Sequence, residues 1–291
     1  MQIPISLISA LIFAPLSAGY LSTLLFNHRR SIPHLPGLLF HSVVPKPKMN
    51  MSHYSTVRFK EFLLCLKKND YQTLTLNQAV QQLNHANGKK CLITFDDGME
   101  CVYTQALPLL REFNFSSTIF CIAGFTGQSS SWDIFDGQKH MSKQQIRGLS
   151  DSGHEIGSHT LTHANLTFLN DRDLEKELKD SKKILEDITG KEINTISFPY
   201  GSWNEHVWRK ALESGYVSAT LYRNHHPISS GLFPVYGVYR FDKPSDIMNR
   251  LQKRRFSASI ATAILMSHFS KGTPVVKFRK NYVIRRNGFL S

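Results

Sequence analysis

Apolar residues along the chain follow two alternating spacings, one typical of buried strands and one typical of helices. Short apolar and β-branched runs predict strands at residues 38–40, 91–95, 117–123, 155–158, 194–198 and 216–221. Apolar residues three or four positions apart predict helices at 56–69, 143–152, 171–189 and 204–214. A further helix is predicted to follow the strand at 91–95 and to end at residue 113. The helix at 171–189 has the clearest ends, because Asn170 or Asp171 can cap its start and Gly190 can stop it. The segment 43–55 is rich in Pro, Lys and Ser and predicts a loop.

Strands that alternate with helices indicate a parallel sheet built from right-handed crossovers. Three polar clusters begin directly after predicted strands, at residues 96, 159 and 199. In parallel α/β folds, ligands bind at the carboxyl ends of the strands. We therefore expect these clusters to meet in a single site.

The first cluster is Asp96-Asp97-Gly98. Side chains alternate along extended chain, so the two carboxylates are expected to point in different directions. One can then bind a metal while the other remains free for proton transfer, and Gly98 allows a tight turn. The alternative is an ordinary turn or helix cap, where the same residue types are common.

The second cluster holds His159 and His163, whose spacing lets both lie on one side of a turn and share a metal. Imidazole is a favoured zinc ligand, and two histidines with one carboxylate leave positions open for water and substrate. The alternative is a chance surface pair, since the chain has 13 histidines. The third cluster, Pro199-Tyr200-Gly201, can wall a groove and offer a backbone N–H to an oxyanion, or simply form a strand-exit turn.

Taken together, three motifs resemble the NodB-type polysaccharide deacetylases, carbohydrate esterase family four. They are TFDDG at 94–98, GHEIGSHTLTH at 153–163 and FPYG at 198–201, and the resemblance extends from about 38 to 240. The run LFHSV at 39–43 resembles the poly-N-acetylglucosamine deacetylase branch. The resemblance implies an α/β fold, a distorted (β/α)7 barrel known as the NodB homology domain. It also implies an enzyme that hydrolyses N-acetyl amides of amino sugars in a poly- or oligosaccharide.

The same resemblance implies a role for each polar cluster. Asp97, His159 and His163 would bind a divalent metal, usually Zn²⁺. Asp96 would act as the general base, and Tyr200 would donate its backbone N–H to the oxyanion.

Two further roles follow from the resemblance. Pro199 and Tyr200 would contact the sugar. His41 would be the general acid, because it directly follows a predicted strand, with His268 in the run 264–268 as the alternative.

The chain departs from the family pattern in two places. Many members have Arg two residues before the proline of the third motif, where this chain has Ser197. That Arg orients the catalytic base, so the partner of Asp96 is left open. A fourth motif of the D-x-D-W type is not recognisable, which leaves the identity of the sugar open.

The amino-acid composition narrows the range of expected binding partners. A formal net charge of +13 suggests an anionic neighbour, such as an anionic membrane surface, or a generally basic exterior. The dense basic groups lie at 253–255 and 277–286, and the other basic residues are dispersed, which argues against nucleic acid. No two of the four cysteines form a C-x-x-C pair, so a thiolate zinc site is unsupported, and Cys91 and Cys121 are expected to be small core residues.

The N-terminal residues 3–26 carry no charged side chain, and a bilayer span needs about 20 mainly apolar residues. We expect a single membrane anchor, or an export signal with 17–19 as its cleavage site; a helix packed on the domain is the alternative. Arg29 and Arg30 favour a cytoplasmic domain, although the side of the membrane stays open. The expected divisions are a hydrophobic segment at 1–30, the catalytic domain at 31–250 and a basic extension at 251–291.

Two other functions compete with polysaccharide deacetylation. A deacylase, either deacetylase or deformylase, acting on a lipid-linked sugar would suit an anchor and a basic surface. A sugar-binding homologue without activity is disfavoured by the intact Asp96-Asp97 and His159/His163 set, because a binding module needs no free carboxylate beside a metal.

Overall fold

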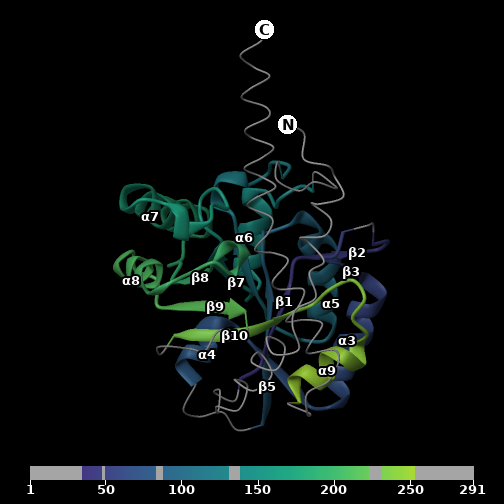
Figure 1. The fold of residues 1–291 in the computed structure, drawn as a ribbon. Coiled ribbons are helices and arrows are strands. Elements are labelled where there is room, and N and C mark those ends of the chain that lie inside the picture. Colours follow the sequence, from purple (N-terminus) through teal and green to yellow (C-terminus); the bar gives the residue numbers. More distant parts are fainter. Residues whose placement is uncertain (1–34, 48–49, 83–87, 131–137, 223–230, 253–291) are drawn as a thin grey trace, which may run out of the picture. The chain divides into compact units, whose positions relative to one another are not determined.

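A computed structural model describes residues 35–47, 50–82, 88–130, 138–222 and 231–252 of the chain. Seven parallel strands form a closed barrel (Figure 1): β1 (Gly37–Phe40), β5 (Lys89–Phe95), β6 (Thr118–Cys121), β7 (Glu155–Ser158), β8 (Thr195–Ser197), β9 (Ser218–Tyr222) and β10 (Leu232–Gly237). The barrel closes because β1 pairs with β10 on one side and with β5 on the other. The predicted (β/α)7 barrel is confirmed.

Three further strands of the described residues lie outside the barrel. Strand β4 (Tyr71–Leu74) pairs with the first half of β5, and β6 pairs with its second half. Strands β2 (Ser42–Val44) and β3 (His53–Ser55) form a parallel pair within the segment predicted to be a loop. That prediction was wrong in part, because Val43 and Tyr54 are fully buried and pair in register.

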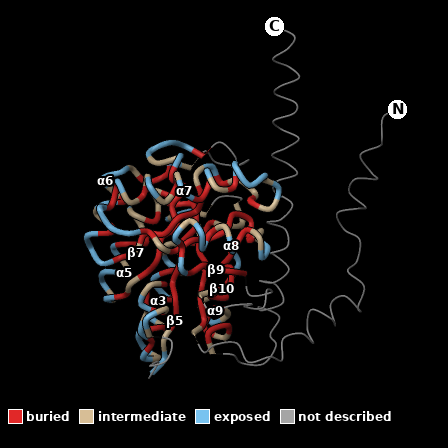
Figure 2. The backbone as a smooth tube through the Cα atoms, turned by 90° about the vertical axis from the view of Figure 1, so that its left-hand side faces the viewer, coloured by how far each residue is buried: buried red, intermediate tan, exposed pale blue. Residues whose placement is uncertain are grey.

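Helices surround the strands, and Figure 2 shows buried strands inside helices whose outer faces are exposed. They are α3 (Thr56–Lys68), α4 (Leu76–Gln82), a π-helical stretch η2 (Val102–Ala106) that runs into α5 (Leu107–Glu112), α6 (Lys143–Asp151), α7 (Asp171–Thr189), α8 (Glu205–Glu213) and α9 (Pro244–Leu251). Three short 3-10 turns, η3 (Ala123–Phe125), η4 (Leu166–Phe168) and η5 (Pro199–Gly201), follow strands β6, β7 and β8.

Helix α7 begins and ends where its sequence predicts. The side chain of Asn170 accepts a hydrogen bond from the Asp173 N–H at 3.0 Å, and Gly190 is left-handed with φ of 68°. The first turn also carries Asp171 and Asp173, whose negative charge favours a helix N-terminus. Because α7 is fixed at both ends, its inner face has a defined position against the turn that follows β7.

Strand β10 and helix α9 carry weak signals in the sequence. Pro234 and Gly237 lie within β10, and both residue types usually argue against a strand interior. In α9 the fully buried Arg250 interrupts the apolar face, but its Nη1 donates to the Asp242 carboxylate at 2.8 Å. A paired charge can therefore occupy a core position that the apolar pattern does not predict.

The cysteines and the membrane predictions have different outcomes. All four cysteines are free, and Cys91 and Cys121 are buried as expected. Among the helices of the described ranges, none has the length and apolar character needed to cross a bilayer. The apolar run at 3–26 and both basic groups near the C-terminus lie outside the described residues, so the predictions about them are untested.

Candidate metal centre

Three side chains from two strand ends converge at the rim of the barrel. Asp97 follows β5, and His159 and His163 follow β7; all three are buried. The Asp97 Oδ1 lies 3.4 Å from the Nε2 of His159 and 3.4 Å from the Nε2 of His163, and all three ligand atoms lie within 4.8 Å of one another. Tetrahedral ligands about 2.0–2.1 Å from a zinc ion are about 3.3–3.4 Å apart. The spacing therefore fits a divalent metal.

The protonation of His159 supports this reading. Its Nδ1 donates to the Ser197 carbonyl oxygen at 2.7 Å, so that nitrogen must carry a proton. Burial lowers the pKa of His159 to about 4, against the opposing pull of the Asp97 charge, so the ring is neutral at pH 7. The Nε2 lone pair then faces the anionic Asp97 oxygen. Two acceptors facing each other in a buried site are unfavourable unless a cation lies between them.

The side chain of Tyr200 sets the orientation of His163. The Tyr200 hydroxyl and His163 Nδ1 are 3.1 Å apart, and the two rings meet edge-on with centroids 4.6 Å apart. Burial, with a smaller contribution from the Asp97 charge, raises the pKa of Tyr200, so its hydroxyl stays protonated. This contact leaves the Nε2 of His163 directed towards Asp97.

Asp97 is an ionised carboxylate that has no hydrogen-bond donor on the oxygen facing the histidines. Burial alone would raise its pKa, but His163, His41, His159 and His140 together outweigh burial and lower it. His140 also donates from Nδ1 to the backbone carbonyl of Asp97 at 2.7 Å. A buried anion with an unpaired oxygen is what a metal ligand requires before the metal binds.

Asp96 is close to the three ligands but has a different environment. The Ser197 hydroxyl donates to its Oδ2 at 2.9 Å, and that oxygen is 3.9 Å from the Nε2 of His159. Its Oδ1 has no hydrogen-bond partner. Burial raises the pKa of Asp96 well above its usual value, and the Asp97 charge raises it further, whereas the Ser197 hydrogen bond lowers it. Such a carboxylate can accept a proton near neutral pH.

The expectation that Asp96 and Asp97 point in different directions was wrong. Both carboxylates approach the same His159 nitrogen. Asp97 has φ of 69°, so it is left-handed and the alternation of extended chain ends at Asp96. Gly98 is also left-handed, and a Cβ there would lie 3.0 Å from the Cys121 sulfur, so the predicted tight turn requires glycine.

Backbone strain is concentrated at this centre. Six non-glycine residues in the described ranges have positive φ, and four of them are site residues: Asp97, Thr160, His163 and Tyr200. Thr160 is β-branched, a residue type that rarely adopts this conformation. Each such residue costs about 1–3 kcal/mol and persists where its surroundings over-determine it. The fold therefore maintains these conformations at a cost in stability.

The remaining predicted residues lie at the same rim or outside the described part. Pro199 and Tyr200 are buried in η5, and the Tyr200 N–H has no hydrogen bond to any described residue. His41 follows β1 and is half-buried, and its charge acts on both Asp97 and His159. His268 lies outside the described residues.

Sequence reasoning singled out Ser197 but left its role open, and it missed His140, which contacts Asp97, and Glu177, which contacts the histidine turn. Ser197 supplies the partner of Asp96 at the position where the family pattern has Arg. Glu177 accepts hydrogen bonds from the turn that carries the histidines. Glu177 could have been noticed in the sequence, because it is a charged residue on the apolar face of α7, beside Leu174 and Leu178.

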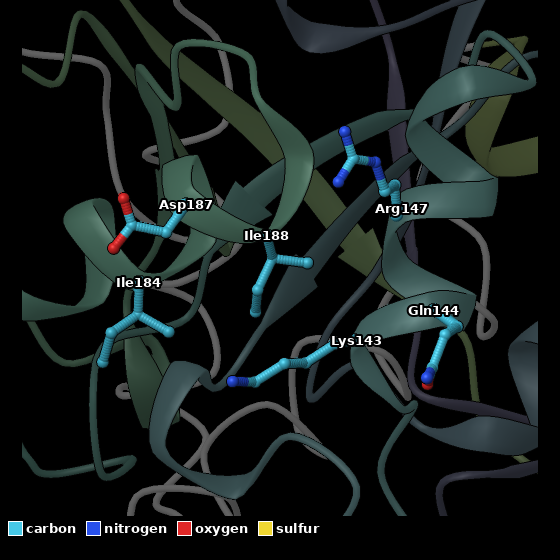
Figure 3. Close-up of a pocket in the computed structure, with 6 residues that line it drawn as sticks. All are labelled: Lys143, Gln144, Arg147, Ile184, Asp187 and Ile188. Atoms are coloured by element: carbon cyan, nitrogen blue, oxygen red, sulfur yellow. The ribbon is translucent and has the colours of Figure 1, made fainter.

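A separate pocket lies between α6 and α7 and does not include the centre (Figure 3). It has a volume of about 350 Å³ and is lined by Lys143, Gln144, Arg147, Ile184, Asp187 and Ile188. Its charged residues have both signs, and none of the predicted site residues lines it. This pocket is therefore separate from the predicted site at the barrel rim.

Comparison with known proteins agrees with this geometry. Residues 84–219 match the family model described as polysaccharide deacetylase. The YxkH protein of Bacillus subtilis is 31% identical over 185 residues, which is 62% of this chain and 62% of that protein. A peptidoglycan-N-acetylglucosamine deacetylase of Bacillus cereus is 37% identical over 131 residues, covering 45% of this chain and 55% of that enzyme. The chain thus spans less than two thirds of the length of either relative.

A solved structure shares the fold. The deacetylase PplD of Streptococcus pyogenes, determined in complex with acetate, superposes with a TM-score of 0.66 at 20% identity. The superposition covers 75% of this chain and 97% of PplD.

Proposed function

We propose that this chain is a metal-dependent amide hydrolase, because its residues 84–219 match the family model described as polysaccharide deacetylase. Its substrate is an N-acetylated amino sugar in a poly- or oligosaccharide, and its products are acetate and the free amine. The cation is a divalent metal, with Zn²⁺ as the first choice because the ligands are two imidazoles and one carboxylate.

One observation carries the proposal. Asp97 Oδ1 lies 3.4 Å from the Nε2 atoms of both His159 and His163, and beside them Asp96 keeps one carboxylate oxygen unpaired. A purely structural cluster would satisfy those oxygens with donors from the protein. A ligand set with an adjacent free base is the arrangement used for metal-assisted hydrolysis.

A divalent metal held by Asp97, His159 and His163 would supply Lewis acidity, which would polarise the acyl carbonyl and lower the pKa of a water molecule towards about 7. Asp96 accepts the proton of the attacking water on Oδ1, while Ser197 holds Oδ2 in place. The Tyr200 N–H donates to the carbonyl oxygen as negative charge develops there. The C–N bond breaks, and His41 donates a proton to the departing nitrogen.

The sugar is proposed to be N-acetylglucosamine in a polymer. The Bacillus cereus relative is named for that sugar in peptidoglycan, and a resemblance near His41 points to the poly-N-acetylglucosamine branch. His41 is the proposed general acid because it lies at the rim, and His268 is the alternative. Whichever of His41→Ala and His268→Ala loses the larger factor in kcat identifies the acid.

The test is acetate release from N-acetylglucosamine oligomers by the full chain loaded with Zn²⁺. Asp96→Asn is the matched variant, because it keeps the side-chain shape and all three metal ligands. We expect Asp96→Asn to retain one equivalent of metal and to lose about 10²–10⁴-fold in kcat. Absence of acetate from the wild type, or full activity in Asp96→Asn, would contradict the proposal.

A further inference from the structure

The turn that joins the two histidine ligands is held by a residue on another element. Residues 159–163 follow β7 directly, and both Thr160 and His163 are left-handed, with φ of 67° and 60°. A bond from the His163 N–H to the Thr160 hydroxyl, at 3.2 Å, is internal to the turn. The Ser197 carbonyl and the Tyr200 hydroxyl pair with the rings of His159 and His163, but the backbone of the turn that carries the rings needs contacts of its own.

Glu177 on α7 supplies contacts to the backbone of the turn. Its Oε2 accepts from the N–H groups of Leu161 and Thr162, each at 2.9 Å. Its Oε1 accepts from the Thr162 hydroxyl. These three bonds bind the two residues that lie between the strained positions.

The opposite side of the turn is held as well. The carbonyl oxygens of Thr160 and Leu161 accept from the N–H groups of Ala123 and Gly124, at 3.1 and 2.9 Å. A Cβ at position 124 would lie 2.5 Å from the Leu161 oxygen, so the two backbones touch. The turn is therefore held between η3 through its carbonyls and Glu177 through its N–H groups.

Glu177 is a buried side chain whose two carboxylate oxygens both accept hydrogen bonds from the turn. It is only 7% exposed, and no Lys, Arg or His of the described ranges forms an ion pair with it. Its charge is balanced by the hydrogen bonds that it accepts from the turn. Bonds to a charged acceptor are roughly twice as strong as bonds between neutral groups, which suits a clamp on a strained segment.

We propose that Glu177 is a positioning residue for the metal site, and that it holds His159 and His163 in their ligating orientation before the metal binds. The inference rests on the proposed function, because it presumes that Asp97, His159 and His163 bind a cation. Preorganised ligands lose less freedom on binding, and partners that orient metal ligands typically contribute 10–100-fold to metal affinity.

Metal titration of the full chain tests this. Co²⁺ is titrated by its visible absorption and Zn²⁺ by chelator competition, for the wild type, Glu177→Ala and Glu177→Gln. We expect Glu177→Ala to raise the metal Kd about 10–100-fold and to alter the Co²⁺ spectrum at saturation. Glu177→Gln keeps an acceptor for both N–H groups but loses the charge, so we expect a Kd about 3–10-fold above that of the wild type.

Glu186→Ala is the matched control on the same helix. Its carboxylate accepts from the Ile193 N–H at 3.1 Å, at the end of α7 away from the histidine turn. We expect a wild-type metal Kd for this variant, even if its melting temperature falls.

The outcomes separate the two proposals. A wild type that binds neither metal overturns the proposed function and this inference with it. If the wild type binds and Glu177→Ala has the same Kd and Co²⁺ spectrum, Glu177 merely stabilises the fold and the inference alone fails. If Glu177→Ala does not fold, Glu177→Gln decides, and a wild-type Kd for it overturns the inference.

Discussion

The two ends of strand β7 both carry polar clusters, but the carboxylates of the two clusters differ in their hydrogen bonds. At the start of β7, Glu155 accepts from the Asn77 N–H at 2.9 Å and from the hydroxyls of Thr118 and Thr195 at 3.1 and 2.8 Å. At the end of β7, Asp96 and Asp97 each keep an oxygen without any donor. Both clusters also contain a buried histidine with its pKa lowered to about 4, His154 at one end and His159 at the other.

The difference teaches how to tell a structural cluster from a reactive one. Burial raises the pKa of Glu155 just as it raises that of Asp96, so the direction of a pKa shift does not separate the two. Unpaired oxygens and left-handed residues do separate the two clusters. Both features cost stability, and both occur together at the carboxyl end of the strands.

Asp97→Ala should have the largest effect on activity. Removing the carboxylate leaves two imidazoles, and we expect metal loss and a fall in kcat/KM on the order of 10³-fold or more. Metal content by atomic absorption and acetate release measure both. Asp97→Asn is the control for backbone effects, because Asn tolerates positive φ. Full metal content in both variants would show that Asp97 is not a ligand.

Glu155→Ala should lower the stability of the fold and leave the activity unchanged. The variant leaves the Asn77 N–H and two threonine hydroxyls without their acceptor, so we expect the unfolding free energy to fall by about 3–4 kcal/mol. Urea denaturation measures this, and metal Kd and kcat/KM should stay at wild-type values where the protein is folded. A change in metal Kd with stability intact would break the comparison.

His154 should make stability depend on pH. Its Nδ1 pairs with the Ser117 hydroxyl at 2.9 Å, and burial, aided by the Arg111 charge, lowers its pKa to about 4. The unfolded chain therefore binds a proton that the folded chain does not between pH 6.5 and about 4. The stability contributed by neutral His154 is present above pH 6.5 and is lost as the pH falls through that window, by about 2–3 kcal/mol.

His154→Asn isolates that contribution, because its side-chain oxygen can replace Nδ1 at Ser117 without titrating. Urea unfolding at pH 7 and pH 4.5 should show a smaller loss on acidification in the variant than in the wild type. Equal losses would show that His154 does not drive the pH dependence.

Ser197→Ala should have the smallest effect, about tenfold in kcat. The variant removes the bond that lowers the pKa of Asp96, so that pKa rises and the acidic limb of kcat/KM moves to higher pH. Ser197→Thr keeps a hydroxyl and should restore most of the rate. An unchanged pH profile in Ser197→Ala would show that the hydroxyl does not serve the base.

The sequence predicts the strands and helices that bear strong apolar patterns. Helix α7 and strand β7 match their predicted bounds, because caps and flanking polar residues mark their ends. Strand β10 and helix α9 escape prediction, because Pro234 and the buried Arg250 break the apolar pattern and tertiary pairing compensates.

The site also has features that the sequence predicts and features that it does not. The convergence of Asp97, His159 and His163 is predictable from their places after parallel strands. The common direction of the Asp96 and Asp97 carboxylates is not predictable, because it depends on a left-handed residue that sequence spacing does not reveal. The contacts of Ser197 and Glu177 join residues 101 and 15–16 positions apart, so only the folded barrel displays them.

Crystals of the full chain grown with Zn²⁺, with anomalous data collected at the zinc edge, test the central claim most directly. We expect one peak about 2.0–2.1 Å from Asp97 Oδ1, His159 Nε2 and His163 Nε2, with Asp96 outside bonding distance. A peak that includes Asp96 as a ligand, a peak held by other residues, or no peak at saturating zinc would contradict it.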